Sequence, residues 1–132
     1  TINPWNEQFL QDLRAYSNLR FMDWSRTNNS NVVNWSERVS KTAGQTEGVA
    51  YEWQIDLCNR MNADMWQTIP AKASDDFIRQ LATLIKNTLN PNLKCYIEYS
   101  NETWSGGSSF NQGDYCGSRG VGMGFAGAAD IY

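Results

Sequence analysis

Lys94-Cys-Tyr-Ile-Glu-Tyr-Ser-Asn-Glu-Thr-Trp104 is an apolar and aromatic run that leads directly into an Asn-Glu pair and then a Trp. Its composition predicts a buried strand over Lys94–Ser100. In α/β barrels the catalytic groups lie at the C-terminal ends of the strands, and Glu102 follows this strand immediately. A plainer alternative is a strand that ends at a polar turn with Glu102 facing water. The choice between these two interpretations of Glu102 depends on the rest of the sequence.

Upstream of this run, short strands alternate with helical patterns. The strands are expected at Leu19–Trp24 and Asp64–Pro70. The helices are expected after an N-cap at Asn3, over Gly48–Met61, and after an N-cap at Ser74. Strands that alternate with helices lie parallel and are joined by right-handed crossovers, so we expect an α/β fold of consecutive parallel βα units. The strands barely alternate between apolar and polar residues, which is typical of burial on both faces.

The chain changes character after Trp104. Ser105–Ser109 reads as a flexible turn, and residues 117–127 place glycines among apolar residues. No strand directly precedes these glycines and no Gly-x-Gly-x-x-Gly has the required context, so a loop or loosely helical segment is favoured over a nucleotide-binding loop. We therefore expect residues 1–104 to form one α/β segment and residues 105–132 to be a Gly/Ser-rich loop and helical continuation of the same domain.

Composition narrows the classes of partner. With 132 residues, 41% of them hydrophobic and 19% charged, the chain suits one globular domain. The net charge of −3 and the absence of any run of five like charges argue against nucleic acid as a partner. No apolar run approaches the roughly 18 to 20 residues of a membrane span, so no span is expected. The first residues lack the pattern of a signal peptide, so we expect that any such peptide has been removed.

The chain has no histidine and three cysteines, Cys58, Cys95 and Cys116. The usual nitrogen ligand of zinc is missing and the cysteines are widely spaced, so neither a metal site nor another cofactor is expected. Acid-base chemistry must then use carboxylates, Tyr, Lys or Cys, and carboxylates are the first candidates. Cys58 and Cys95 are interpreted as small core residues, and Cys116, in a glycine-rich segment, as the most exposed of the three.

Three Asn-x-Ser/Thr triplets begin at Asn28, Asn34 and Asn101. Such triplets accept N-linked sugar only on the surface of a secreted chain. Asn28 and Asn34 lie in a long polar loop expected over residues 25–47, so they are the candidate acceptors. If Asn101 is a site residue, it should carry no sugar.

Four stretches taken together resemble a family of barrel proteins related to clan A glycoside hydrolases, often described as cellulose-binding or glycosidase-like. They are Leu19–Trp24, Gly48–Trp53, Asp64-Met-Trp66 with Ile69-Pro70, and Tyr96–Trp104. The resemblance covers the chain up to about Trp104 and weakens after Ser105. It implies that Leu19–Trp24, Met65–Ile69 and Cys95–Asn101 are the second, third and fourth strands of a (β/α)₈ barrel.

The same resemblance implies roles for three residues. Glu102 matches the acid/base carboxylate of the clan, and Asn101 matches the residue that hydrogen-bonds the sugar 2-hydroxyl. Arg20 matches the strand-two arginine that supports the nucleophile. The nucleophile of the clan is a second Glu on the seventh strand, which this sequence does not reach.

Further candidates follow from the residues themselves. Period-two alternation puts Glu98 on the same strand face as Glu102; a buried Glu needs a partner, and Arg20 is the best candidate. The alternative is that Glu98 faces solvent on an edge strand. Near the strand ends, Trp24, Trp66 and Trp104 offer flat faces that suit sugar rings, with core packing as the alternative for each. Asp23, also near a strand end, is placed to bind hydroxyl groups.

These expectations combine into one hypothesis and one rival. A retaining mechanism needs two carboxyl groups about 5 to 5.5 Å apart, and a barrel needs about 250 residues, so the chain supplies about half a barrel and one catalytic group. The hypothesis is a segment of a secreted glycosidase-like protein that acts on or binds β-linked polysaccharide, inactive alone and needing further polypeptide to cover its strand edges. The rival is a non-catalytic extracellular carbohydrate-binding or structural assembly protein.

Overall fold

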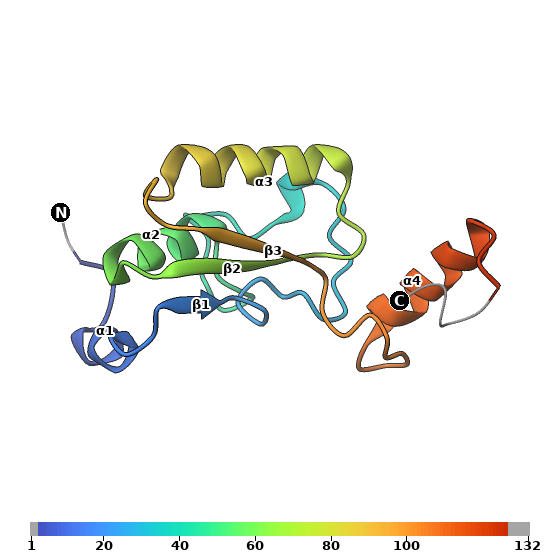
Figure 1. Cartoon of the computed structure of the whole chain (residues 1–132), viewed down its shortest axis with the longest axis horizontal. Helices are drawn as coiled ribbons and strands as arrows, with labels where there is room; N and C mark the ends of the chain where they lie inside the picture. Colours follow the sequence, from blue (N-terminus) through green and yellow to red (C-terminus); the bar gives the residue numbers. More distant parts are fainter. Residues whose placement is uncertain (1–2, 127–132) are drawn as a thin grey trace.

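Three parallel strands form one open sheet in the computed structural model, which describes residues 3–126 (Figure 1). The strands are β1 (Asn18–Arg20), β2 (Asp64–Ile69) and β3 (Cys95–Tyr99), in that order across the sheet. Helix α2 (Tyr51–Met61) connects β1 to β2, and helix α3 (Asp75–Thr88) connects β2 to β3. The prediction of an α/β fold with consecutive parallel βα units is therefore confirmed.

Helix α3 shows why the sequence pattern located the helices well. The Ser74 side chain accepts a hydrogen bond from the backbone N–H of Phe77 at 3.2 Å, as an N-cap should. Acidic residues occupy the first turn, where their negative charges interact favourably with the positive end of the helix dipole. The apolar stripe predicted from helical spacing is buried at Phe77, Leu81 and Ile85. Local signals of this kind are contained within a few residues and can be recognised without the rest of the fold.

Both connecting helices pack on one face of the sheet. Met65 and Ile69 alternate onto that face of β2 and are almost completely buried there. The core that forms between sheet and helices consists of Leu19, Phe21, Tyr51, Ile55, Leu57, Cys58, Ala63, Met65, Ile69, Phe77, Leu81 and Ile85. Burial of the Cys58 thiol in this core raises its pKa to about 12, which confirms its interpretation as a small core residue.

The opposite face of the sheet is covered near the end of β2, where the buried Thr68 hydrogen-bonds to Thr27, but it is open around Trp66 and Tyr96 among the described residues. The register places Arg20 beside Trp66 and Trp66 beside Tyr96, so these side chains share that face. Trp66 is 40% exposed and Tyr96 46% exposed. The prediction that the strands are buried on both faces is therefore wrong for this structure, because both connecting helices lie on the other side.

Two predicted boundaries at the start of the chain differ from the structure. Helix α1 spans Glu7–Leu13 and its N-cap is Asn6, not Asn3, because the Asn6 side chain accepts from the backbone N–H groups of Gln8 and Phe9 in the first turn. The predicted strand Leu19–Trp24 ends at Arg20. A turn follows it, closed by a hydrogen bond from the Ser25 N–H to the Phe21 carbonyl at 3.2 Å.

The segment after Trp104 contains helix α4 (Asn111–Gly122), so the helical continuation is present. Figure 1 shows α4 set apart, beyond the C-terminal ends of β2 and β3. Cys116 lies in this helix and not in a loop, and it is half-buried, as Cys95 is. The expected loop at Cys116 is therefore wrong, and Cys116 is more exposed than the buried Cys58. All three cysteines have free thiols. The end of the predicted glycine-rich stretch, residue 127, lies outside the described residues.

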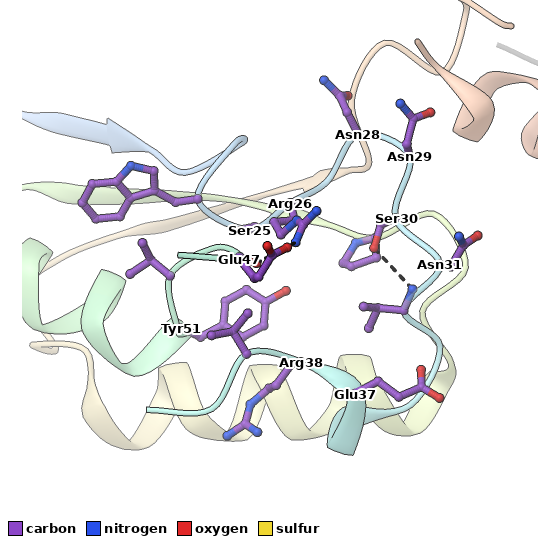
Figure 2. A pocket seen from close by; sticks show the side chains of 15 residues that line it. Ser25, Arg26, Asn28, Asn29, Ser30, Asn31, Glu37, Arg38, Glu47 and Tyr51 are labelled. Carbon is purple, nitrogen blue, oxygen red and sulfur yellow. Dashed lines mark hydrogen bonds and ion pairs between the residues drawn. The ribbon is translucent and has the colours of Figure 1, made fainter. Parts of the chain in front are cut away.

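The long polar loop after β1 carries one short 3₁₀ helix, η1 (Trp35–Glu37). Together with Tyr51 and Pro70, the loop lines a cavity of about 400 Å³ (Figure 2). Within residues 3–126, no helix is long and apolar enough to cross a membrane.

Candidate functional site

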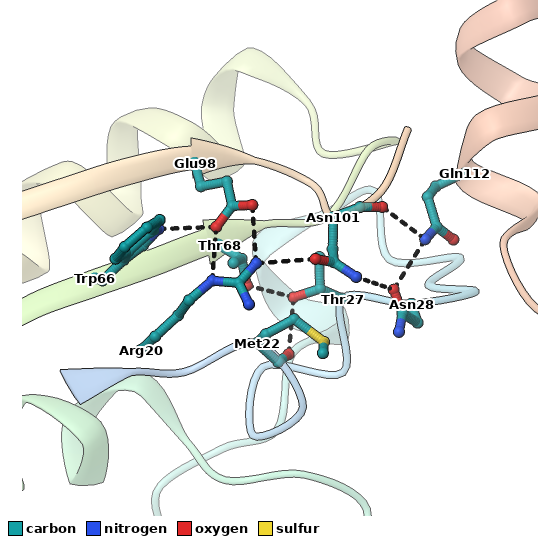
Figure 3. Close-up of polar contacts among 9 residues, drawn as sticks. All are labelled: Arg20, Met22, Thr27, Asn28, Trp66, Thr68, Glu98, Asn101 and Gln112. Atoms are coloured by element: carbon teal, nitrogen blue, oxygen red, sulfur yellow. Dashed lines mark hydrogen bonds and ion pairs between the residues drawn. The ribbon is translucent and has the colours of Figure 1, made fainter. Parts of the chain in front are cut away.

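Arg20, Glu98 and Asn101 meet at the C-terminal ends of β1 and β3 (Figure 3). The Arg20 guanidinium donates two hydrogen bonds to the Glu98 carboxylate, from Nε at 3.0 Å and from Nη2 at 2.9 Å. Nη2 also donates to Oδ1 of Asn101 at 2.9 Å. The two parallel bonds form a bidentate pair, a geometry that fixes both planes. Arg20 is therefore the partner of Glu98, as predicted, although β3 is an edge strand of the described sheet and the Glu98 side chain is still 28% exposed.

Trp66 completes this pair on the uncovered face of the sheet. Its indole Nε1 donates to Oε2 of Glu98 at 2.8 Å, and its ring lies beside the Arg20 guanidinium at 5.3 Å from the ring centroid. The hydrogen bonding of the guanidinium to the Glu98 carboxylate raises the pKa of Arg20 above its ordinary value. Burial opposes this shift, whereas the negative charges of Glu98, Glu102 and Asp23 add to it. Arg20 is thus a permanent positive charge held in one orientation.

Asn101 is the buried centre of the site and is only 4% exposed. While its Oδ1 accepts from Arg20, its Nδ2 donates to Oδ1 of Asn28 at 2.9 Å. Gln112 donates to the same Asn28 oxygen at 2.9 Å and to the Asn101 carbonyl at 2.8 Å. Both ends of the Asn101 amide are therefore engaged inside the protein, and the side chain is held without rotational freedom.

Gln112 joins three separate segments and was not predicted from the sequence. It is 1% exposed and lies in the first turn of α4, and its Oε1 accepts from the backbone N–H of Asn29 at 3.0 Å. Asn29 in turn accepts from the N–H of Asn111 at 2.8 Å, at the start of the same helix. The loop after β1, the end of β3 and α4 are thereby locked together. No local sequence pattern marks Gln112, because its role depends on where α4 lies.

Glu102 extends from an unusual backbone. Its φ is +45°, and Ser100, two residues earlier, has a φ of +56°. Left-handed conformations cost a non-glycine residue about 1 to 2 kcal/mol, so the turn on either side of Asn101 is strained. The Glu102 side chain is exposed and its carboxylate accepts no hydrogen bond from residues 3–126. Glu102 is therefore presented to solvent next to the buried site, and the described residues enclose it in no aromatic cleft.

Of the remaining candidates predicted from the sequence, two lie near this site and one packs in the core. Trp104 is 69% exposed, two residues beyond Glu102, with its ring free of the aromatic clusters of the described chain. Asp23 is exposed in the turn that follows β1, near enough to Arg20 to act on it electrostatically. Trp24 is not brought to the site. It packs between Phe9 and Phe21 and stacks on Trp5, so core packing is its role.

The three candidate sugar acceptors lie in different environments. Asn101 is buried and hydrogen-bonded at both polar atoms of its side chain, so it is inaccessible to a glycosylating enzyme. Asn28 is half-buried and accepts two hydrogen bonds through Oδ1. Asn34 is exposed, and its Nδ2 donates to Glu37 at 3.0 Å. Asn34 is thus the most accessible acceptor of the three.

The described residues contain no group of three or more His, Cys, Asp or Glu side chains that could hold a metal ion. The chemical groups at the site are one free carboxylate, one paired carboxylate, a fixed guanidinium and a set of amides. A free carboxylate can transfer a proton or, with a partner carboxylate, take part in a two-step displacement. The paired groups can orient hydroxyl groups.

Gly113 determines how closely α4 approaches the turn that carries Glu102. A Cβ added there would overlap the carbonyl oxygen of Ser105 and would lie 2.9 Å from that of Thr103. We expect Gly113→Ala to destabilise the protein by about 3 to 5 kcal/mol, because backbone atoms must separate to accept the methyl group. Denaturant unfolding of the full-length protein would measure the loss.

Gly122→Ala is the matched control for this substitution. Gly122 ends the same helix, and a Cβ there would meet nothing within 4 Å. We expect this variant to be unchanged or more stable by about 0.5 to 1 kcal/mol. Equal stability of the two variants would show that α4 does not pack against the turn at Thr103–Ser105.

Comparisons of this chain with protein-family models, with curated proteins and with solved structures gave no significant match.

Proposed function

We propose that the chain is part of a secreted glycosidase-like (β/α)₈-barrel protein that acts on β-linked polysaccharide. The observation that carries the proposal is the fixed group of Arg20, Glu98 and Asn101 at the C-terminal ends of parallel strands, with Glu102 directly beyond it. In barrel enzymes this end of the strands bears the chemistry. The strained turn at Ser100 and Glu102 adds support, because strain of this kind persists most often at functional sites.

In the proposed mechanism Glu102 is the general acid/base. Its carboxyl proton passes to the glycosidic oxygen as the bond between that oxygen and the anomeric carbon breaks. A second carboxylate, outside this chain, attacks the anomeric carbon and forms a glycosyl-enzyme intermediate. Glu102 then removes a proton from the water that hydrolyses this intermediate. Asn101 would contact the sugar 2-hydroxyl, Trp104 would lie against a sugar ring, and Asp23 would bind a more distant hydroxyl.

The half-barrel architecture is part of the same proposal. Both helices that connect the strands lie on one face of the sheet, as they do on the outside of a barrel. The other face carries Arg20, Trp66, Tyr96 and Glu98 and would become the interior. With β1, β2 and β3 as the second to fourth strands, the outer edges of β1 and β3 would pair with strands supplied by further polypeptide.

The experiment that tests the proposal is an assay of the full-length protein on soluble β-glucan and β-mannan. Reducing ends released over time would measure hydrolysis, and retention on the immobilised polysaccharides would measure binding. We expect both hydrolysis and binding. If the protein neither hydrolysed nor bound any of these polysaccharides, a carbohydrate function would be refuted altogether.

Binding without hydrolysis would instead support a second candidate, a non-catalytic extracellular carbohydrate-binding protein. One observation favours this candidate: the Asn101 side chain is only 4% exposed, and both of its polar atoms already bind partners in the protein, Arg20 and Asn28. In an enzyme of the proposed type, substrate has to displace the Asn28 contact. In a binding protein, the hydrogen-bonded group of Arg20, Glu98 and Asn101 would serve only to hold the loop that carries Trp104 in place.

A further inference from the structure

The cavity between the loop after β1 and the N-terminal end of α2 is separate from the Glu102 site. It holds about 400 Å³, within the range of small-molecule sites in proteins, which is about 300 to 1,000 Å³. Val32, Val39 and Val49 supply apolar surface, and Ser25, Ser30 and Asn31 supply polar groups. Asn28 and Asn29 line the cavity and also take part in the hydrogen-bond network around Asn101 and Gln112.

A single buried phenol is aimed into this cavity. Tyr51 is 4% exposed, and its ring is fixed by stacking on Trp35 and by an edge contact with Phe77. Figure 2 shows its hydroxyl pointing toward the middle of the cavity. This hydroxyl has no hydrogen-bond partner within residues 3–126. The hydroxyl oxygen is not among the described side-chain atoms that are both fully buried and unpaired, so it is open to the cavity and free to bind a ligand there.

The charged groups around the cavity are already neutralised. Arg26 forms an ion pair with Glu47, and Arg38 forms one with Glu52 at 2.7 Å. Arg38 also lies over the Trp35 ring, 4.0 Å from its centroid. These pairs leave no uncompensated charge to attract an ion.

Glu37, the remaining charged residue of the lining, is likewise occupied. Its carboxylate accepts from the backbone N–H groups of Val33 at 2.8 Å and Asn34 at 2.9 Å. Burial raises the pKa of Tyr51, so its hydroxyl keeps its proton and is available as a donor. The cavity therefore combines apolar walls and neutral hydrogen-bonding groups with charged groups that already bind other parts of the protein.

We propose that this cavity is a binding site for a single neutral sugar ring, with the Tyr51 hydroxyl as its central hydrogen-bonding group. A pyranose has hydroxyl groups around its edge and apolar C–H faces, which match the polar and apolar lining. An anionic ligand would find both cations of the lining, Arg26 and Arg38, already paired with carboxylates. The site is distinct from the proposed catalytic position, since Glu102 lies outside the lining.

Isothermal titration of the full-length protein with D-glucose, D-mannose, D-xylose and N-acetyl-D-glucosamine, one at a time, tests the proposal. We expect saturable binding of at least one sugar and a loss of about tenfold in affinity for Tyr51→Phe, the value of one hydrogen bond. Because the hydroxyl has no protein partner, Tyr51→Phe should leave the melting temperature of the sugar-free protein unchanged or slightly raised. Tyr16→Phe is the matched control, since Tyr16 is 60% exposed and outside the cavity.

Two further variants separate the possible outcomes. Val39→Phe fills the cavity while keeping Tyr51, and we expect it to abolish binding. Glu102→Gln should leave this binding unchanged. The proposal is overturned if none of the four sugars binds saturably or if Tyr51→Phe binds as tightly as the wild type. Binding that is lost in Glu102→Gln but kept in Tyr51→Phe would assign the sugar to the proposed catalytic position and would also overturn it.

Discussion

Glu102→Gln in the full-length protein should lower kcat for hydrolysis of β-linked polysaccharide by about 10²- to 10⁴-fold, the usual contribution of a general acid/base. An amide has nearly the same shape as a carboxylic acid but cannot donate the proton that the leaving oxygen needs. The Glu102 carboxylate is exposed and has no hydrogen-bond donor among the described residues, so its replacement should leave the fold intact. KM should change little, because the contacts that hold substrate remain.

Two comparisons make the result specific to proton transfer. An aryl glycoside with a weakly basic phenol as leaving group needs little acid assistance, so the loss in its bond-breaking step should be much smaller than with polysaccharide. Glu7→Gln is the control variant, because Glu7 is an exposed carboxylate in α1, at the other end of the described chain. Unchanged hydrolysis of both glucan and mannan by Glu102→Gln would remove Glu102 from the mechanism.

The βα order of the fold could be predicted because its signals are local. Helix α3 was located by Ser74 and by apolar spacing within four turns, and β2 and β3 by apolar runs that end at polar or proline residues. The start of α1 was misplaced because Asn3 and Asn6 are both good N-cap residues. Asn3 instead closes a turn by accepting from the N–H of Trp5 at 3.1 Å. Sequence alone gives no means of ranking two such caps three residues apart.

The site was predictable only where a residue needed a particular partner. A Glu98 on a strand predicted to be buried requires a cation, and Arg20 is the one cation expected on a neighbouring strand, so the pair could be inferred. Gln112 had no such requirement, and its contacts to Asn28 and Asn101 depend on the position of α4. Trp24 was misassigned to the site because its partners come from α1, whose packing the sequence does not reveal.

The exposed surface of β3 leads to the second large expected effect. Ile97 is 54% exposed and Tyr99 57% exposed, in addition to Trp66 and Tyr96 on the other face. Strands β1 and β3 are both edges of the sheet, so each presents unpaired N–H and C=O groups to solvent. An edge that is apolar and parallel promotes association with other chains.

Residues 1–132 expressed alone should therefore be insoluble or molten, without a cooperative thermal transition. The expected signs are retained far-UV circular dichroism, weak near-UV signal and strong binding of a hydrophobic dye. A monodisperse monomer that melts cooperatively would contradict this and would mean that the fold is a small closed domain.

Ile97→Lys tests whether the edge of β3 is open to solvent or is covered by further polypeptide in the full-length protein. In the isolated fragment, a lysine on the open edge should raise solubility, because charged edge residues oppose strand pairing between chains. It should not restore cooperative melting, because it supplies none of the missing core. In the full-length protein the same substitution should destabilise by about 3 kcal/mol or more if a neighbouring strand and helix bury this side chain, since an unpaired charge would then lie in an apolar interface. Unchanged stability of full-length Ile97→Lys would show that the edge of β3 stays open to solvent, and the proposed barrel could not then continue beyond this strand.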